Sequence, residues 1–242
     1  MKSFLGLKSF NLKTILLIPG YMCDENIWKF QIKELRKKYK VIFAKLRKGE
    51  TVKEYSSNII KSLPKKFSII GFSMGGFIAL DLSLNHPERV EKLILVGTNG
   101  RSISDKRKKF LKKFCDEINK ENFINEFCNA NINSYFSKIN QSNMQYLNLI
   151  KTMVKKLGYL VFKRQTNAIL KRPSVLSKLS KIKLKCLIVS GSNDTLSTKE
   201  MNTELKKRIK NSELFFIKKS SHFVMFEQAK KFNNKILEWM EN

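Results

Sequence analysis

A tight turn between two glycines is the sequence feature that most constrains the fold of this chain. Residues 71–75 read Gly-Phe-Ser-Met-Gly, after a short apolar run and before an apolar segment with helical spacing. The pattern G-x-S-x-G between a strand and a helix is typical of a turn that lifts a strained serine above the edge of a sheet. Gly71 and Gly75 leave room for the strand and the helix to pack around it. Ser73 is therefore a candidate nucleophile.

The first hundred residues alternate between short apolar runs and segments with helical periodicity. This alternation predicts an α/β fold with a mostly parallel sheet and helices on both of its faces. The expected strands are 13–18, 39–44, 67–70, 92–97, 185–190 and 213–218. The expected helices are 27–38, 52–63, 76–85 and 226–240.

The pattern changes in the middle of the chain, where helical segments replace the alternation. Phe110, Leu111 and Phe114 recur at helical spacing, with charged residues between them. Because strands return later, we interpret residues 101–181 as a helical lid inserted into a body made of residues 1–100 and 182–242. The Phe, Leu and Met side chains of the insertion either line a pocket or pack the lid onto the body, and the sequence does not decide between these roles.

A serine nucleophile needs a base that takes its proton and a carboxylate that holds the base. The chain has two histidines. His86 ends the helix that Ser73 starts, about 20 Å away at roughly 1.5 Å per residue, and is expected to be structural. His222 and Asp194 each follow an expected strand, and the carboxyl ends of parallel strands share one edge of a sheet. The order Ser73, Asp194, His222 predicts a catalytic triad.

An acyl-transfer site also needs backbone N–H groups that stabilise an oxyanion. Met74 follows the candidate nucleophile at the start of a helix, where N–H groups lack partners within the helix. Tyr21 lies in the loop after the first expected strand, and the neighbouring Gly20 allows this backbone to come close. The N–H groups of Tyr21 and Met74 are therefore the predicted oxyanion hole.

These motifs resemble the α/β-hydrolase superfamily over nearly the whole chain. Residues 16–24 read Leu-Leu-Ile-Pro-Gly-Tyr-Met-Cys-Asp, and Trp28 follows, which is similar to a bacterial subgroup with an LPG-x-x-C-D oxyanion loop. The Pro-Glu-Arg-Val of 87–90 and the Gly-Ser-Asn-Asp of 191–194 also correspond. The resemblance implies an α/β-hydrolase fold with a helical cap after the sixth family strand, the Ser-Asp-His triad and no cofactor.

The resemblance is less specific for the reaction. We expect a serine hydrolase that cleaves a carboxylic ester with a small or medium acyl group through an acyl-serine intermediate. The first alternative is an esterase or thioesterase acting on carrier-protein-bound acyl groups, similar to pimeloyl methyl ester esterases. The others are a lyase or carbon–carbon bond hydrolase on the same triad, and a pseudoenzyme that binds its ligand without hydrolysis.

The chain carries a formal net charge of +28 at pH 7. Two interpretations stay open. The charge either reflects a composition rich in residues with AT-rich codons, or it attracts an acidic partner such as an acyl-carrier protein. No basic run is interleaved with aromatic residues, so nucleic acid is not an expected partner. A small-molecule ester is the main expected partner.

The chain shows no pattern of a membrane span or of a metal site. The apolar run in residues 1–20 is too short for either a span or a signal peptide, and it ends in Pro-Gly, so we interpret it as the first strand. The four cysteines have no C-x-x-C spacing, and with only two histidines they indicate no metal site. We expect a cytoplasmic protein without a cofactor or a metal.

Overall fold

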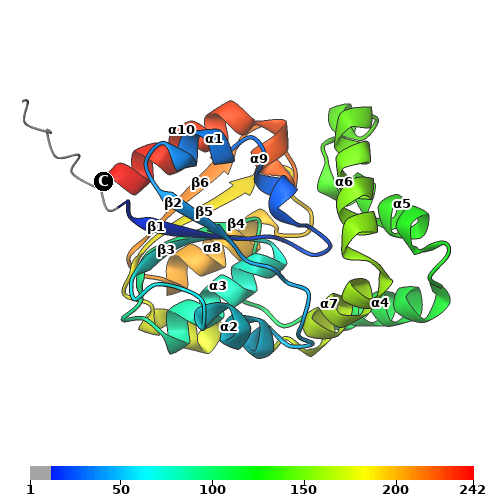
Figure 1. Ribbon diagram of the computed structural model, residues 1–242, viewed down its shortest axis with the longest axis horizontal. Helices are drawn as coiled ribbons and strands as arrows, with labels where there is room; N and C mark the ends of the chain where they lie inside the picture. Colours follow the sequence, from blue (N-terminus) through cyan, green and yellow to red (C-terminus); the bar gives the residue numbers. More distant parts are fainter. Residues whose placement is uncertain (1–11) are drawn as a thin grey trace, which may run out of the picture.

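A six-stranded parallel sheet forms the centre of the computed structural model, which describes residues 12–242 (Figure 1). The strand order is β2-β1-β3-β4-β5-β6. The strands are β1 (Thr14–Ile18), β2 (Lys40–Phe43), β3 (Phe67–Phe72), β4 (Val90–Val96), β5 (Lys185–Gly191) and β6 (Ser212–Ile217). All six predicted strands are present with bounds shifted by one or two residues, and the part of the stretch 1–20 before residue 12 lies outside the described residues.

The side chains of the central strands alternate between two hydrophobic cores, one on each face of the sheet. In β1, Ile15 and Leu17 belong to one core, and Leu16 and Ile18 belong to the other. Helices cover both faces (Figure 1). One face carries α2 (Val52–Ile60), α3 (Met74–Asn85) and α8 (Lys199–Arg208), and the other carries α1 (Ile32–Arg36) and α10 (Ala229–Glu241).

Two predicted helices are each divided into shorter pieces. The segment 27–38 is not one helix, because Asp24 accepts a hydrogen bond from the Asn26 N–H and starts the separate 3-10 turn η1 (Glu25–Trp28). The segment 226–240 begins earlier than predicted, as α9 (Val224–Glu227), and is interrupted at Gln228. Gln228 has φ −133° and ψ 47°, outside the helical region, which separates α9 from α10.

The residues between β4 and β5 form helices and no strand within the described chain. These are α4 (Asp105–Glu117), α5 (Phe123–Tyr135), η2 (Lys138–Asn140), α6 (Met144–Leu157), α7 (Tyr159–Lys171) and η3 (Leu176–Lys181). Helices α4 to α7 stand together beyond the carboxyl ends of the strands (Figure 1). Phe127 of α5 and Phe162 of α7 belong to the same core as Ile15 and Leu17. The division of the chain into a body and a lid at residues 101–181 stays a prediction.

Candidate active site

The turn between β3 and α3 holds Ser73 in a strained backbone conformation. Ser73 has φ 51° and ψ −113°, and its N–H donates a hydrogen bond to the carbonyl of Val96 in β4. A Cβ atom on Gly71 would lie 2.6 Å from the carbonyl oxygen of Gly75, and one on Gly75 would lie 2.3 Å from that of Ile18. Only glycine fits at these two positions, so the turn can be this tight.

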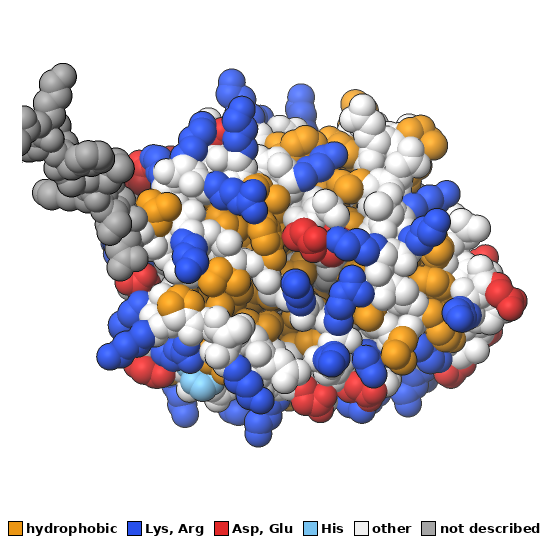
Figure 2. All heavy atoms as spheres, in the orientation of Figure 1, with side chains coloured by type: hydrophobic (Ala, Val, Ile, Leu, Met, Phe, Trp, Pro, Cys, Tyr) orange, Lys and Arg blue, Asp and Glu red, His pale blue; other side chains and the backbone are white. Residues whose placement is uncertain are grey.

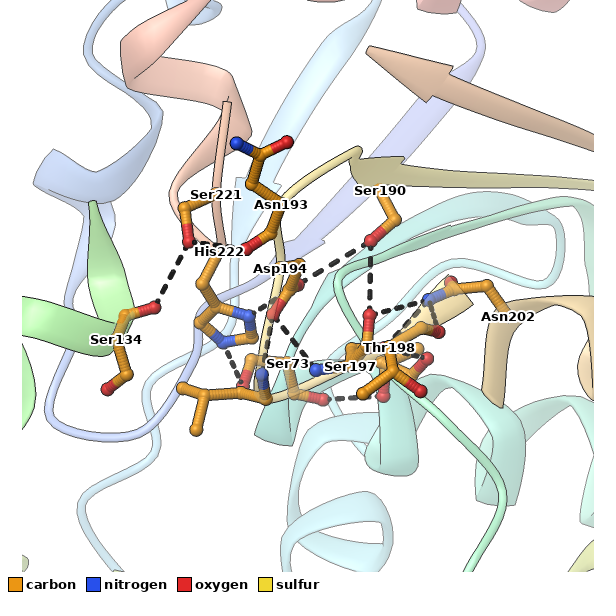
Figure 3. A network of polar contacts seen from close by, with 12 residues as sticks. Ser73, Ser134, Ser190, Asn193, Asp194, Ser197, Thr198, Asn202, Ser221 and His222 are labelled. Atoms are coloured by element: carbon orange, nitrogen blue, oxygen red, sulfur yellow. Dashed lines mark hydrogen bonds and ion pairs between the residues drawn. The ribbon is translucent and has the colours of Figure 1, made fainter. Parts of the chain in front are cut away.

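The structure brings Ser73, Asp194 and His222 together at the carboxyl edge of the sheet (Figure 3). The Nε2 atom of His222 lies 2.9 Å from the Oγ of Ser73, and its Nδ1 lies 2.8 Å from the Oδ2 of Asp194. Both the imidazole and the carboxylate are buried. His86 lies at the opposite end of α3 from Ser73 and has no part in this arrangement.

The carboxylate of Asp194 is oriented by its own loop. Its Oδ1 accepts hydrogen bonds from the N–H groups of Leu196 and Ser197, at 2.8 and 2.9 Å. Its other oxygen therefore stays turned toward His222. Gly97 has φ 52°, and a Cβ atom there would lie 3.2 Å from the imidazole Nδ1 and 3.3 Å from the carboxylate Oδ2. A glycine at this position lets the two side chains pack against the backbone of the β4 loop.

The two predicted oxyanion donors, Tyr21 and Met74, lie beside Ser73 in the wall of one cavity. Within residues 12–242, neither backbone N–H donates a hydrogen bond to another backbone group. The cavity has a volume of about 340 Å³ and is bounded by the sheet edge and by side chains of α4, α5 and α7. Burial raises the pKa of the Tyr21 and Tyr135 phenols in its wall, so both are neutral near pH 7.

Comparison with known proteins identifies the family. The family model described as the alpha/beta hydrolase fold matches residues 60–229, more than half of the chain. This chain belongs to the α/β-hydrolase family. Solved structures agree: an enol-lactonase from Burkholderia xenovorans superposes with a TM-score of 0.87 at 19% identity, covering 98% of this chain and 94% of that one. An esterase from Thermogutta terrifontis, solved with malate bound, has a TM-score of 0.84 at 19% identity, covering 95% and 91%.

Curated relatives of this α/β hydrolase carry names from two reaction classes. A pimeloyl-[acyl-carrier protein] methyl ester esterase of Legionella pneumophila is 35% identical over 96 residues, which are 38% of this chain and 40% of the esterase. A 2-hydroxy-6-oxononadienedioate/2-hydroxy-6-oxononatrienedioate hydrolase of Pseudomonas putida is 27% identical over 179 residues, covering 72% of this chain and 63% of that protein. The matched region thus spans about two fifths of the length of the esterase.

Two polar residues of α7, which the sequence analysis did not identify, hold the loop that carries the predicted oxyanion donor Tyr21. The buried Gln165 accepts a hydrogen bond from the Met22 N–H at 2.8 Å and donates one to the Leu46 carbonyl at 2.9 Å. Its neighbour Thr166 lies 2.5 Å, Oγ1 to Oη, from the hydroxyl of Tyr21. The sequence feature that could have indicated them is a pair of polar residues on the buried face of a predicted helix. Their partners could not be predicted, because they lie more than 100 residues away in the sequence.

The loop that carries His222 is fastened to the inserted helices through Glu227, a second residue that sequence reasoning missed. One Glu227 oxygen accepts a hydrogen bond from the Ser221 N–H at 2.6 Å. The other accepts hydrogen bonds from the Ser137 N–H and the Asn140 side chain, both at 2.8 Å. In Figure 3, Ser221 also reaches toward α5, where its hydroxyl contacts the carbonyl of Ser134. The loop before α9 is therefore fixed from two sides.

No cluster of three or more metal-binding side chains is found in residues 12–242. The predictions of no metal and no cofactor stay predictions.

Proposed function

We propose that this α/β hydrolase cleaves a carboxylic ester through an acyl-serine intermediate. The observation that carries the proposal is the chain of contacts from Ser73 Oγ to His222 Nε2 and from His222 Nδ1 to Asp194 Oδ2, at 2.9 and 2.8 Å. These distances lie within hydrogen-bond reach, as a nucleophile and its base require. The strained turn at Ser73 supports a catalytic role over a merely structural one.

In the proposed reaction, the hydroxyl of Ser73 attacks the ester carbonyl while His222 takes its proton. Asp194 stabilises the imidazolium that forms, and the N–H groups of Tyr21 and Met74 donate hydrogen bonds to the oxyanion. The imidazolium then gives its proton to the leaving alcohol. In the second half, His222 takes a proton from a water molecule as its oxygen attacks the acyl carbonyl. The imidazolium then returns this proton to the Ser73 oxygen as the acyl–oxygen bond breaks, which releases the acid and restores the free serine.

The test is the hydrolysis of p-nitrophenyl esters from acetate to dodecanoate by the wild type and by Ser73→Ala. We expect the variant to keep its fold and to lose roughly 10⁴-fold or more in kcat. Ser62→Ala, in the exposed turn after α2, is the matched control and should be fully active. Labelling of the wild type, but not of Ser73→Ala, by a fluorophosphonate would support a nucleophilic serine. Full activity of Ser73→Ala would contradict the mechanism, and an unlabelled wild type without turnover would favour a ligand-binding pseudoenzyme.

A second candidate is hydrolysis of an ester on an acyl-carrier protein. Two observations favour it: the names of the Legionella and related esterases, and the net charge of +28. Lys and Arg side chains are spread over the face seen in Figure 2 and outnumber the acidic ones between them. Activity on a carrier-bound ester that falls steeply with added salt, while activity on a free ester does not, would support this candidate.

The carbon–carbon bond hydrolase named among the relatives provides the contrasting substrate class. Turnover of a ring-fission dienedioate in preference to any ester would replace the ester proposal with carbon–carbon bond hydrolysis on the same triad.

For its location we propose the cytoplasm. All four cysteines are buried and unpaired, which is the state expected in a reducing compartment. Among the described helices, none has both the length and the apolar character needed to cross a bilayer.

A further inference from the structure

The cavity above Ser73 contains an arginine without an acidic partner. Arg172 follows the last residue of α7 and lines the cavity, with its guanidinium carbon 3.9 Å from the centre of the Phe77 ring. Its Nε is buried and has no hydrogen-bond partner. Within residues 12–242, its guanidinium forms no ion pair. A partly buried guanidinium in this state is unusual, because the lost hydration is normally replaced by hydrogen bonds to an anion.

A second arginine adds positive charge to the same cavity. Arg107 of α4 lines it and forms no ion pair with a described residue. Desolvation and the neighbouring Arg107 lower the pKa of Arg172 to about 10, so Arg172 is still charged at neutral pH. Arg101, the third arginine of the wall, is neutralised by Glu204 at 2.7 Å. Among the described residues, no aspartate or glutamate lines the cavity, so two positive charges face it without compensation.

We propose that Arg172 and Arg107 bind a carboxylate of the substrate, so that this hydrolase acts on esters that carry a second, free acid group. The inference rests on the proposed ester hydrolysis at Ser73 and adds a substrate class to it. A planar guanidinium can donate two parallel hydrogen bonds to a carboxylate, and the low-dielectric wall strengthens this contact. Monoesters of dicarboxylic acids have the required chemistry: one end offers the carbonyl to Ser73 and the other end offers the anion.

The test compares monomethyl and dimethyl esters of the same dicarboxylic acids, from succinate to azelate. The two series differ in one methyl group and one charge, so the ratio of their kcat/KM values isolates the effect of the anion. We expect the wild type to prefer the best monomethyl ester by about 10- to 100-fold, the range of a charge-assisted hydrogen bond. Arg172→Met keeps an extended side chain against Phe77 but has no donors, and should reduce this ratio about tenfold or more. Arg172→Lys should restore part of it.

The matched control is Arg36→Met. Arg36 also lies over an aromatic ring, that of Phe43 at 6.0 Å, but it is on α1 and does not line the cavity. It should leave the ratio unchanged. Inorganic phosphate and free adipate, tested as competitors, distinguish a phosphate site from a carboxylate site: stronger competition by phosphate would overturn the assignment.

The inference and the proposed function fail in different ways. Ser73-dependent hydrolysis with equal kcat/KM for charged and neutral esters would overturn the carboxylate site and leave the esterase intact. If no ester is hydrolysed, calorimetric titration with adipate still decides the inference. Binding that is lost in Arg172→Met supports it, and an absence of binding to the wild type overturns it.

Discussion

Replacing Gln165 with leucine should separate the two functions that we assign to this side chain, stability and positioning of the oxyanion loop. The amide of Gln165 is completely buried and bridges Met22 and Leu46, which are themselves buried. Leucine has a similar volume, so it creates no large cavity. It leaves the Met22 N–H and the Leu46 carbonyl without partners, however, and each orphaned group costs about 1–3 kcal/mol. We therefore expect the free energy of unfolding to fall by about 2–6 kcal/mol.

The same substitution should slow catalysis beyond its effect on folding. Met22 has φ 53°, a strained conformation that the hydrogen bond from its N–H to Gln165 helps to maintain. Without this bond, the adjacent Tyr21 N–H is no longer fixed at the position where the proposed mechanism places the oxyanion. Complete loss of one such donor costs about 3–4 kcal/mol in the transition state, so partial displacement should lower kcat by roughly 10- to 100-fold with little change in KM.

The assay has two parts, with Asn167→Leu as the control. Asn167 is also an amide residue of α7, but it lies nearer the surface and contacts Glu50 at 3.3 Å. Chemical denaturation measures the stability of both variants, and ester hydrolysis is measured well below the melting temperature of Gln165→Leu. If Gln165→Leu is destabilised but hydrolyses the ester at the rate of the wild type, the positioning role is refuted. If it is not destabilised, the energetic reasoning itself is wrong.

Two further predictions concern the His222 loop and the pH dependence. Glu227→Gln leaves one acceptor oxygen for donors on both sides, so the Ser221 N–H or the Ser137 N–H loses its partner. We expect kcat to fall while KM is kept. An unchanged kcat would show that the His222 loop keeps its position without Glu227. Because the pKa of Arg172 is lowered to about 10, the preference for charged esters should persist at neutral pH and decline as the pH rises through about 10. A pH profile of the monomethyl to dimethyl ratio measures this, and a flat ratio would exclude Arg172 as the anion's partner.

The sequence predicted the sheet and the three residues that the sheet itself positions. Ser73, Asp194 and His222 each follow a strand, and parallel strands bring their carboxyl ends to one edge, so their proximity follows from topology alone. Gln165 and Glu227 could not be placed in this way. Their partners lie on other elements, and which turn of an inserted helix faces the body depends on side-chain packing that helical periodicity does not encode.

The position of Arg172 in the cavity wall is another side-chain placement that the sequence did not predict. The sequence shows an arginine near the end of the insertion, but nothing in it distinguishes a solvated guanidinium from one stacked on Phe77. The two divided helices have a different cause. Asp24 interrupts one helical pattern through a local hydrogen bond, and Gln228 interrupts the other through its backbone conformation. Neither effect is visible in the spacing of apolar residues.

The hydrogen bonds of Gln165 and Glu227 join helices of the predicted lid to the rest of the chain, and this bears on how substrate range evolves. A cap attached only by apolar packing could be exchanged as a module between related enzymes. Here the helices that cover the cavity also support the backbone at Met22 and at Ser221, next to the predicted oxyanion donor Tyr21 and the proposed base His222. Grafting a foreign cap would therefore impair the chemistry along with the specificity, and new substrates are more readily reached by single substitutions in the cavity wall.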